Sequence, residues 1–311
     1  MSFKKIKKIL AKSIPLWAVI LIVLNSVLYT GIIQYYLSQK QLQLNFLELS
    51  KSTKDPEELV NILKQEVLPP DGFRTVVSWG NIGKQLIESG VISEEKYKKI
   101  FTDNTNGGDY MKYLEEESGD YMVINEKNAH FMVNTLWALG LVNKSDVLTK
   151  GQMQKDPKQT ANFASTGGWT LGKKDAMSYY SSKVIIPLTQ DQQDLVTKIA
   201  GNVYRPCCGN NTAFPDCNHG MAALGYIQLA VSKGLPEDQI YKDLLAFNSF
   251  WFPQTYVEMA AYFNKEGIDW KKVDAKLALS QEYSSATGAQ RIKQSVQDIP
   301  SFQNKGGSCG A

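Results

Sequence analysis

The chain has 311 residues, of which 43% are hydrophobic and 21% are charged, and these proportions exclude both a disordered tail and a multi-span membrane protein. The formal net charge of +3 is unevenly distributed. Five lysines and no acidic residue lie within residues 1–13, whereas the rest of the chain holds 29 basic and 31 acidic side chains. Nucleic-acid binding needs concentrated positive charge, so we expect no nucleic-acid partner.

The N-terminal segment is long and apolar. No charged residue lies between Ser13 and Gln39, and residues 14–33 are mostly apolar. As a helix these residues would be about 30 Å long, which is enough to cross a bilayer. We therefore predict a transmembrane signal anchor over residues 14–36, with the basic flank 1–13 in the cytoplasm and the bulk of the chain extracytoplasmic.

A cleaved signal peptide is the alternative to an anchor in the cell membrane. Signal peptides usually have a shorter apolar run that ends in a small-x-small cleavage site. The exit of this run, from Ser26 to Gly31, is a poor site. The lipid bilayer is therefore an expected partner of a single-pass protein, and the sequence leaves open a membrane or extracytoplasmic protein partner.

The remaining chain is expected to be mostly α-helical. Residues 37–55 are predicted to form a juxtamembrane stalk, residues 56–300 one helical extracytoplasmic domain, and residues 301–311 a flexible tail. Asp55 and Pro56 are typical of a helix start, and that helix is predicted to end before Pro69. Only residues 121–124 and 183–187 resemble short strands.

Glycines recur just past apolar helix ends, each followed by a residue that can open a new helix. Such glycines supply the left-handed conformation that closes a helix, so they predict helix-loop-helix units. The four positions are Gly90, Gly140, Gly234 and Gly267. Their spacing is irregular, which argues against a solenoid repeat.

Scarce ligand residues cluster in one short segment. Of the four cysteines and two histidines in the chain, Cys207, Cys208, Cys217 and His219 fall within 13 residues. Three thiolates and an imidazole form a ligand set suited to zinc, copper(I) or an iron–sulfur centre. Residues 207–219 are therefore the predicted metal or metallocofactor site, and Cys309 near the C-terminus is a possible additional ligand.

The second half of the cluster is predicted to open a helix. Asp216 is a good helix cap, which would place Cys217 and His219 in the first turn. Unpaired N–H groups and the helix dipole lower the pKa of a thiol there, and Arg205 would help at Cys207 if it lies close.

Two other readings of the cysteines stay open. The spacing matches none of the strong zinc patterns, and disulfides persist outside the membrane. In the first, the same cysteines serve a thiol-disulfide oxidoreductase or another thiol-reactive enzyme. In the second, a disulfide bond cross-links a loop in a structural or partner-binding ectodomain. For a metal protein, the expected roles are metal capture, sensing or electron transfer.

Several weaker motifs are set aside. Residues 167–174 match a phosphate-binding loop except at the last position, where Lys174 replaces the required Ser or Thr. Residues 103–109 resemble a calcium loop, but the twelfth position is Leu114 instead of a glutamate. Residues 163–169 are interpreted as a surface turn, with a loop that lines the thiol site as the alternative. His130 is predicted to be a core histidine. The aromatic residues among 247–252 are predicted to belong to the core at a helix end.

Overall fold

The computed structural model describes residues 15–52, 56–101 and 110–302. Within them the protein is mostly helical, with one sheet of two short strands and one N-terminal apolar helix, which confirms the predicted fold class. The basic flank 1–13, the Asp55 cap and residues 303–311 of the predicted tail lie outside the described residues. Contacts divide the chain into an N-terminal helical unit and a larger helical domain.

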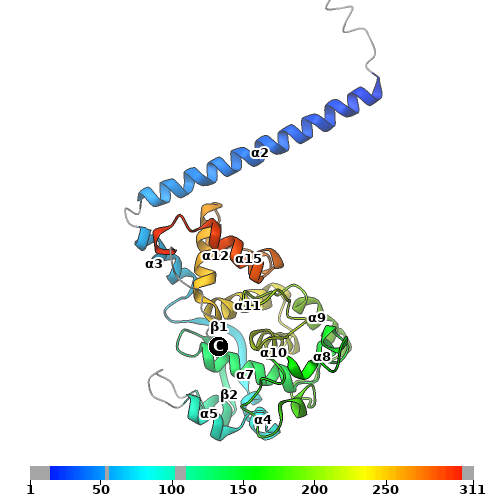
Figure 1. The fold of residues 1–311 in the computed structure, drawn as a ribbon. Helices are drawn as coiled ribbons and strands as arrows, with labels where there is room; N and C mark the ends of the chain where they lie inside the picture. Colours follow the sequence, from blue (N-terminus) through cyan, green and yellow to red (C-terminus); the bar gives the residue numbers. More distant parts are fainter. Residues whose placement is uncertain (1–14, 53–55, 102–109, 303–311) are drawn as a thin grey trace, which may run out of the picture. The chain divides into compact units, whose positions relative to one another are not determined.

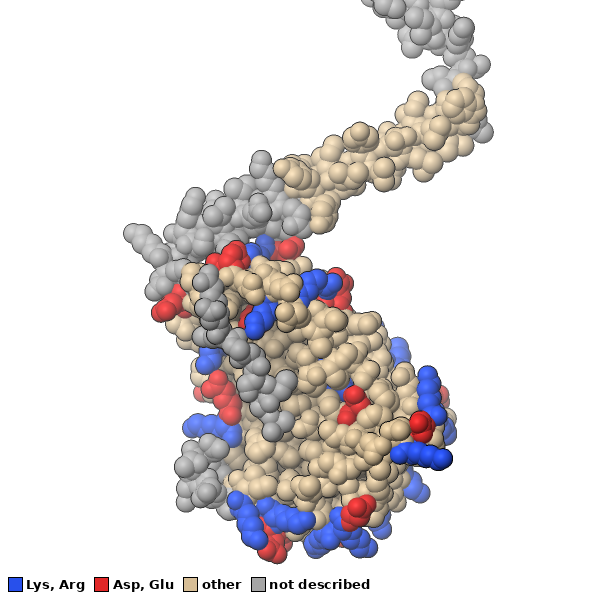
Figure 2. Space-filling model, in the orientation of Figure 1, with Lys and Arg blue, Asp and Glu red and all other residues tan. Residues whose placement is uncertain are grey.

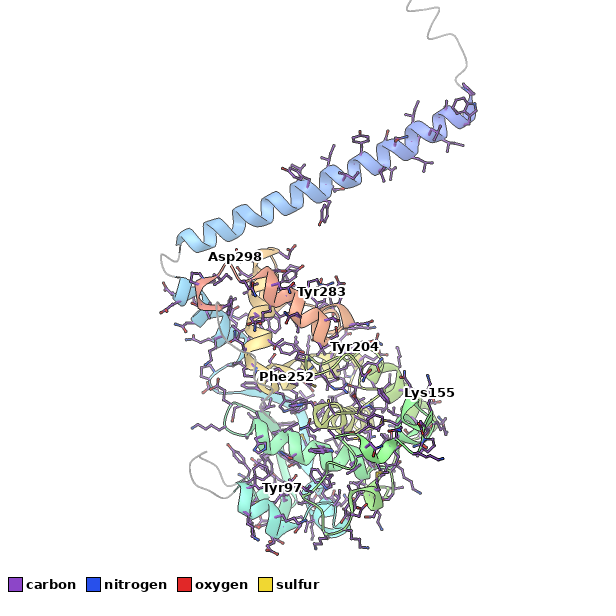
Figure 3. All side chains as sticks on the ribbon, viewed as in Figure 1. Tyr97, Lys155, Tyr204, Phe252, Tyr283 and Asp298 are labelled. Carbon is purple, nitrogen blue, oxygen red and sulfur yellow. The ribbon has the colours of Figure 1, made fainter. Side chains whose placement is uncertain are left out.

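Helix α2 (Leu16–Ser52) carries the apolar segment. Its part Trp17–Leu37 is long and apolar enough to cross a membrane, a property shared by N-terminal signal sequences. Figure 3 shows the side chains of this part projecting on all sides, and Figure 2 shows no charged atoms along it. Large apolar side chains such as Trp17 and Ile22 are exposed here, which is costly in water. The helix continues unbroken through most of the predicted stalk.

The centre of the larger domain is a pair of closely packed helices, α7 (Ala129–Val142) and α10 (Asn218–Ser232) (Figure 1). Both are buried along almost their whole length. Gly140 was predicted to close a helix, but it lies inside α7. A Cβ there would lie 2.0 Å from the carbonyl oxygen of Met221, so glycine is needed for the close approach of the two backbones.

Other helices surround this pair. The longer ones are α3 (Pro56–Val67), α4 (Ile82–Ser89), α5 (Glu94–Phe101), α9 (Gln190–Ala200), α11 (Glu237–Trp251), α12 (Pro253–Lys265) and α15 (Ala286–Ser295). The four-residue helices are α6 (Lys112–Glu115), α8 (Asp146–Thr149), α13 (Ala275–Ala278) and α14 (Gln281–Ser284). Helix α3 ends before Pro69, as predicted.

The sheet pairs β1 (Phe73–Gly80) with β2 (Ser118–Ile124) in antiparallel orientation, and Phe73 lies opposite Ile124. Strand β2 contains the predicted residues 121–124, whereas β1 was not predicted. Residues 183–187 do not form a strand, which corrects the prediction. Only Lys183 forms an isolated bridge, to Asn143, whose side-chain oxygen accepts hydrogen bonds from the two backbone N–H groups of residues 185 and 186.

Most of the predicted helix punctuation is confirmed. Gly90, Gly234 and Gly267 have positive φ angles of 78°, 71° and 75°. The aromatic residues at the end of α11 are buried, as expected. The prediction that His130 is a core residue is wrong, because this residue is exposed at the start of α7. Its ring centroid lies 5.2 Å from that of Phe101.

Candidate metal centre

The segment before α10 folds back on itself. Tyr204 and Asn211 form an antiparallel bridge, and the backbone N–H of Thr212 donates to the carbonyl of Val203 at 2.8 Å. The Thr212 hydroxyl donates to the same carbonyl at 3.0 Å. This reversal returns the chain after Cys208 toward its own start, so that Cys217 meets the first two cysteines.

The three sulfur atoms of Cys207, Cys208 and Cys217 all lie within 4.8 Å of one another. Cys207 Sγ and Cys217 Sγ lie 3.4 Å apart. Sulfurs bound to one tetrahedral zinc ion at about 2.3 Å lie about 3.8 Å apart, so these spacings suit a shared ion after small side-chain rotations. All three cysteines are free and partly exposed, which leaves them reachable from solvent.

A buried arginine is the main electrostatic feature of the cluster. The side chain of Arg205 is 1% exposed, and its Nε donates to Cys217 Sγ at 2.9 Å. Its Nη2 contacts a carboxylate oxygen of Asp216 at 2.8 Å, and its Nη1 donates to the carbonyl of Asn210 at 3.2 Å. A buried guanidinium needs anionic partners, and here they are a carboxylate and the sulfur of Cys217. Arg205 was expected to lower the pKa of Cys207 if it lay close, and its charge does act in that direction, although the hydrogen bond goes to Cys217.

Cys217, and not Asp216, is the cap of α10. Its sulfur accepts from the backbone N–H of Gly220 at 3.4 Å. Asp216 instead binds Arg205 and accepts from the side-chain amide of Asn210 at 2.8 Å. The prediction of the cap is therefore wrong by one residue, because the ion pair draws the Asp216 carboxylate away from the helix N-terminus.

These contacts favour one thiolate among three sulfurs. Hydrogen bonds from Cys207 and Cys208, followed by the charge of Arg205 and a hydrogen bond from His219, hold the pKa of Cys217 well below the usual thiol value. The pKa of Cys207 is raised, first by its hydrogen bonds to Cys208 and Cys217 and then by burial. The directions of these shifts make Cys217 the most acidic of the three thiols.

His219 lies beside the cysteines without joining the group of mutually close ligand atoms. The side chain is buried, with its ring 4.4 Å from the Phe252 ring and 5.7 Å from the Trp251 ring. Figure 3 shows Phe252 between α11 and α12. The role of His219 as a ligand stays a prediction, and Cys309 lies outside the described residues.

The loop 163–169 packs against the cluster segment and is not a free surface turn. The backbone N–H of Ser165 donates to the carbonyl of Asp216 at 3.2 Å, and the rings of Phe163 and Phe214 contact edge to face at 5.3 Å. Ser165 and Thr166 are fully buried. This contact fixes the backbone immediately before Cys217. In the sequence, the only indication of this role is the glycine- and hydroxyl-rich composition of the loop.

Of the two ligand-binding loop patterns set aside from the sequence, only the first lies within the described residues. Residues 167–174 form turns and bends, with no helix start for a bound phosphate, and residues 103–109 lie outside the described residues. No protein-family model, curated protein or solved structure matches the chain.

Proposed function

We propose that this is a single-pass, membrane-anchored extracytoplasmic protein that binds a soft metal ion through Cys207, Cys208 and Cys217, with His219 as the fourth ligand. The observation that carries the proposal is the mutual proximity of three partly exposed thiol sulfurs. Thiolate sulfur prefers zinc, copper(I) and iron–sulfur centres over hard cations such as calcium or magnesium.

The charges around the cluster favour a divalent ion. Arg205 contacts Asp216 and Cys217, the pKa of Cys217 is lowered, and the pKa values of Cys207 and Cys208 are raised, so before a metal binds we expect one thiolate and two thiols. A divalent ion held by three thiolates displaces two protons, so the total charge of the buried group is unchanged. Zinc therefore fits without a new uncompensated charge beside the buried guanidinium of Arg205.

The proposed compartment gives the cluster its biological setting. The apolar helix α2 and the five preceding lysines support an uncleaved anchor with its N-terminus in the cytoplasm. Outside the membrane, thiols persist when they are bridged, bound to metal or kept reduced. A metal site would keep three adjacent thiols from pairing, and it would serve metal capture, sensing or electron transfer.

Metal analysis of the full chain, purified without oxygen in detergent, tests this proposal. We expect about one equivalent of a soft transition metal per chain and about two protons released on loading. Each of Cys207→Ser, Cys208→Ser and Cys217→Ser should weaken zinc binding by roughly two orders of magnitude, because structural zinc binding of about 10–16 kcal/mol is shared among four ligands.

Cys309→Ser is the matched control, since it removes a thiol outside residues 207–219. Unchanged zinc affinity would limit the site to the clustered cysteines, and weaker binding would add Cys309 to the ligands. Less than a tenth of an equivalent of any transition metal, in protein whose thiols are all reduced and which binds no added zinc, would contradict the proposal.

A second function is supported by one distance. Cys207 Sγ and Cys217 Sγ are 3.4 Å apart, and a disulfide bond of about 2.05 Å requires only a small rotation of each side chain. With a thiolate on Cys217, this pair suits a thiol-disulfide oxidoreductase. Mass mapping after controlled oxidation discriminates the two functions: a rapidly reduced bridge and disulfide exchange activity favour the enzyme, and a bridge resistant to mild reductant favours a structural role.

A further inference from the structure

The three clustered cysteines are not equivalent. Cys207 Sγ lies 3.4 Å from Cys217 Sγ. Cys208 Sγ instead contacts two oxygen acceptors, the carbonyl of Asn210 at 3.8 Å and the carboxylate of Asp216 at 3.9 Å. The cluster therefore contains one close pair of sulfurs and a third thiol with oxygen partners of its own.

The adjacent pair Cys207 and Cys208 is unsuited to a disulfide bond. Consecutive Cα atoms are about 3.8 Å apart across a trans peptide, whereas disulfides usually need about 4.4–6.8 Å between their Cα atoms. Cys207 and Cys217 are free of this restraint, because the chain reversal brings them together from separate segments. Closing their sulfur distance from 3.4 Å to a bond of about 2.05 Å needs only small side-chain rotations. The arrangement therefore favours a Cys207–Cys217 bridge.

The surroundings of the pair accommodate the bridged state. A disulfide sulfur carries no negative charge, so a bridge removes one anionic partner of the buried Arg205 guanidinium. The guanidinium keeps its contacts with the Asp216 carboxylate at 2.8 Å and with the carbonyls of Asn210 at 3.2 Å and Phe214 at 3.3 Å. Arg205 thus stays paired with one carboxylate when Cys217 is oxidised, and the buried charge stays compensated.

We propose that the cluster is a redox-controlled metal site, in which a low-molecular-weight disulfide converts Cys207 and Cys217 to a disulfide bond and thereby releases the metal ion. This inference rests on the proposed metal binding and adds its regulation. It differs from the oxidoreductase function, because its product is a free metal ion and one bridged chain, without catalytic turnover. In the proposed extracytoplasmic compartment such a bridge persists.

The reaction balances on sulfur alone. Two zinc-bound thiolates supply two electrons, the S–S bond of the small disulfide breaks, and a new S–S bond joins Cys207 to Cys217. The two sulfurs of the oxidant leave as thiolates that take protons from water. Zinc has no redox chemistry and leaves as the divalent ion, because Cys208 and His219 are the only proposed ligands that remain. Losing two of four ligands should weaken zinc binding roughly ten-thousandfold, since each contributes about two orders of magnitude.

The test uses the zinc-loaded full chain in detergent, kept without oxygen and titrated with oxidised glutathione. Bound zinc is measured before the oxidant is added. Failure to load zinc contradicts the proposed metal site, and failure to release loaded zinc contradicts only this inference. A chromophoric chelator, chosen so that it removes no zinc before oxidation, then measures the release.

We expect one zinc ion released and two molecules of reduced glutathione formed for each bridge, as the balance of the reaction requires. Peptide mapping should place the bridge between Cys207 and Cys217 and leave Cys208 as a free thiol. An excess of dithiothreitol should restore zinc binding.

Two variants of the metal-free protein compare the possible pairs. Cys208→Ser retains the close pair and should form the bridge, whereas Cys207→Ser leaves Cys208 with Cys217 and should form one at least about tenfold more slowly. Cys309→Ser is the matched control and should release its zinc as the unaltered protein does.

The inference is overturned if loaded zinc stays bound in excess oxidised glutathione, if the bridge contains Cys208, or if the cysteines end as mixed disulfides with glutathione. These outcomes are measured on unaltered protein, so they decide the matter even where a variant does not fold.

Discussion

The start and the middle of α10 use glycine for different purposes. In the body of the helix, Gly225 lets the backbone approach α7, and a Cβ there would lie 2.3 Å from the carbonyl oxygen of Leu136. At the start of the helix, Gly220 leaves room for the guanidinium of Arg205, and a Cβ would lie 2.3 Å from its Nη2. The first contact packs two apolar helices, and the second brings a buried charge to a sulfur.

This difference separates stability from chemistry within one helix. Packing around Gly225 is apolar and stabilises the domain independently of metal binding or oxidation at the cysteines. The region around Gly220 holds Arg205, Asp216 and Cys217, which must balance one another's charge. Substitutions along α10 should therefore separate into those that change only the free energy of unfolding and those that also change metal binding.

The largest expected effect follows from removing the buried positive charge. Arg205→Met leaves the Asp216 carboxylate and the Cys217 sulfur without their cation, so the free energy of unfolding should fall by about 3–5 kcal/mol. Urea denaturation of the metal-free protein measures this change. Arg291→Met is the control, because both its ion pair with the Glu282 carboxylate at 3.8 Å and its hydrogen bond to the Glu282 carbonyl at 2.6 Å are exposed, and it should cost under about 1 kcal/mol. Similar small losses in both variants would refute the central role of Arg205.

Gly220→Ala should affect both properties. The new methyl group displaces the guanidinium from Cys217, so we expect about 1–3 kcal/mol lower stability and about 10- to 100-fold weaker zinc binding. Competition with a chromophoric chelator measures the zinc affinity. A variant with unaltered zinc affinity would show that the position of Arg205 does not matter to the metal.

Gly225→Ala should affect stability alone. The methyl group collides with backbone of α7, which should cost about 1–3 kcal/mol, while zinc affinity of the folded protein stays the same. Gly119→Ala is the matched control, because a Cβ at that position meets nothing within 4 Å. Loss of zinc affinity in folded Gly225→Ala would remove the distinction between the start and the middle of α10.

The smallest effect concerns the pH dependence of the metal-free protein. The folded-state pKa of Cys217 is lowered, so its thiolate stabilises the fold fully above the ordinary thiol pKa, and this contribution is lost as pH falls through the lowered value. Ultraviolet absorbance should show about one thiolate at neutral pH, absent in Cys217→Ser. Absence of any thiolate in the unaltered protein at neutral pH would disagree with this charge assignment.

The fold was largely predictable because its signals are local. Apolar periodicity, glycine closures and the Pro56 start mark helices without reference to distant residues. Strand β1 was missed because its pairing with β2 depends on a partner far along the chain. The prediction that Gly140 closes a helix was wrong for a similar reason, because glycine is needed there for the close approach of α10 and not for the end of its own helix.

The candidate site was predictable in composition but not in arrangement. Clustering of scarce cysteines indicated the chemistry, and the chain reversal between Tyr204 and Asn211 makes their contact possible. The exchange of roles between Asp216 and Cys217 depends on burial of Arg205, which sequence spacing does not reveal. The contact between residues 163–169 and the cluster is likewise tertiary.

X-ray absorption spectroscopy of the zinc-loaded full chain tests the central claim most directly. The account predicts three sulfur neighbours at about 2.3 Å and one nitrogen neighbour at about 2.0–2.1 Å from the zinc ion. Cys208→Ser should reduce the sulfur count to two. Zinc surrounded only by oxygen and nitrogen atoms, in protein whose cysteines are reduced, would contradict a metal centre at Cys207, Cys208 and Cys217.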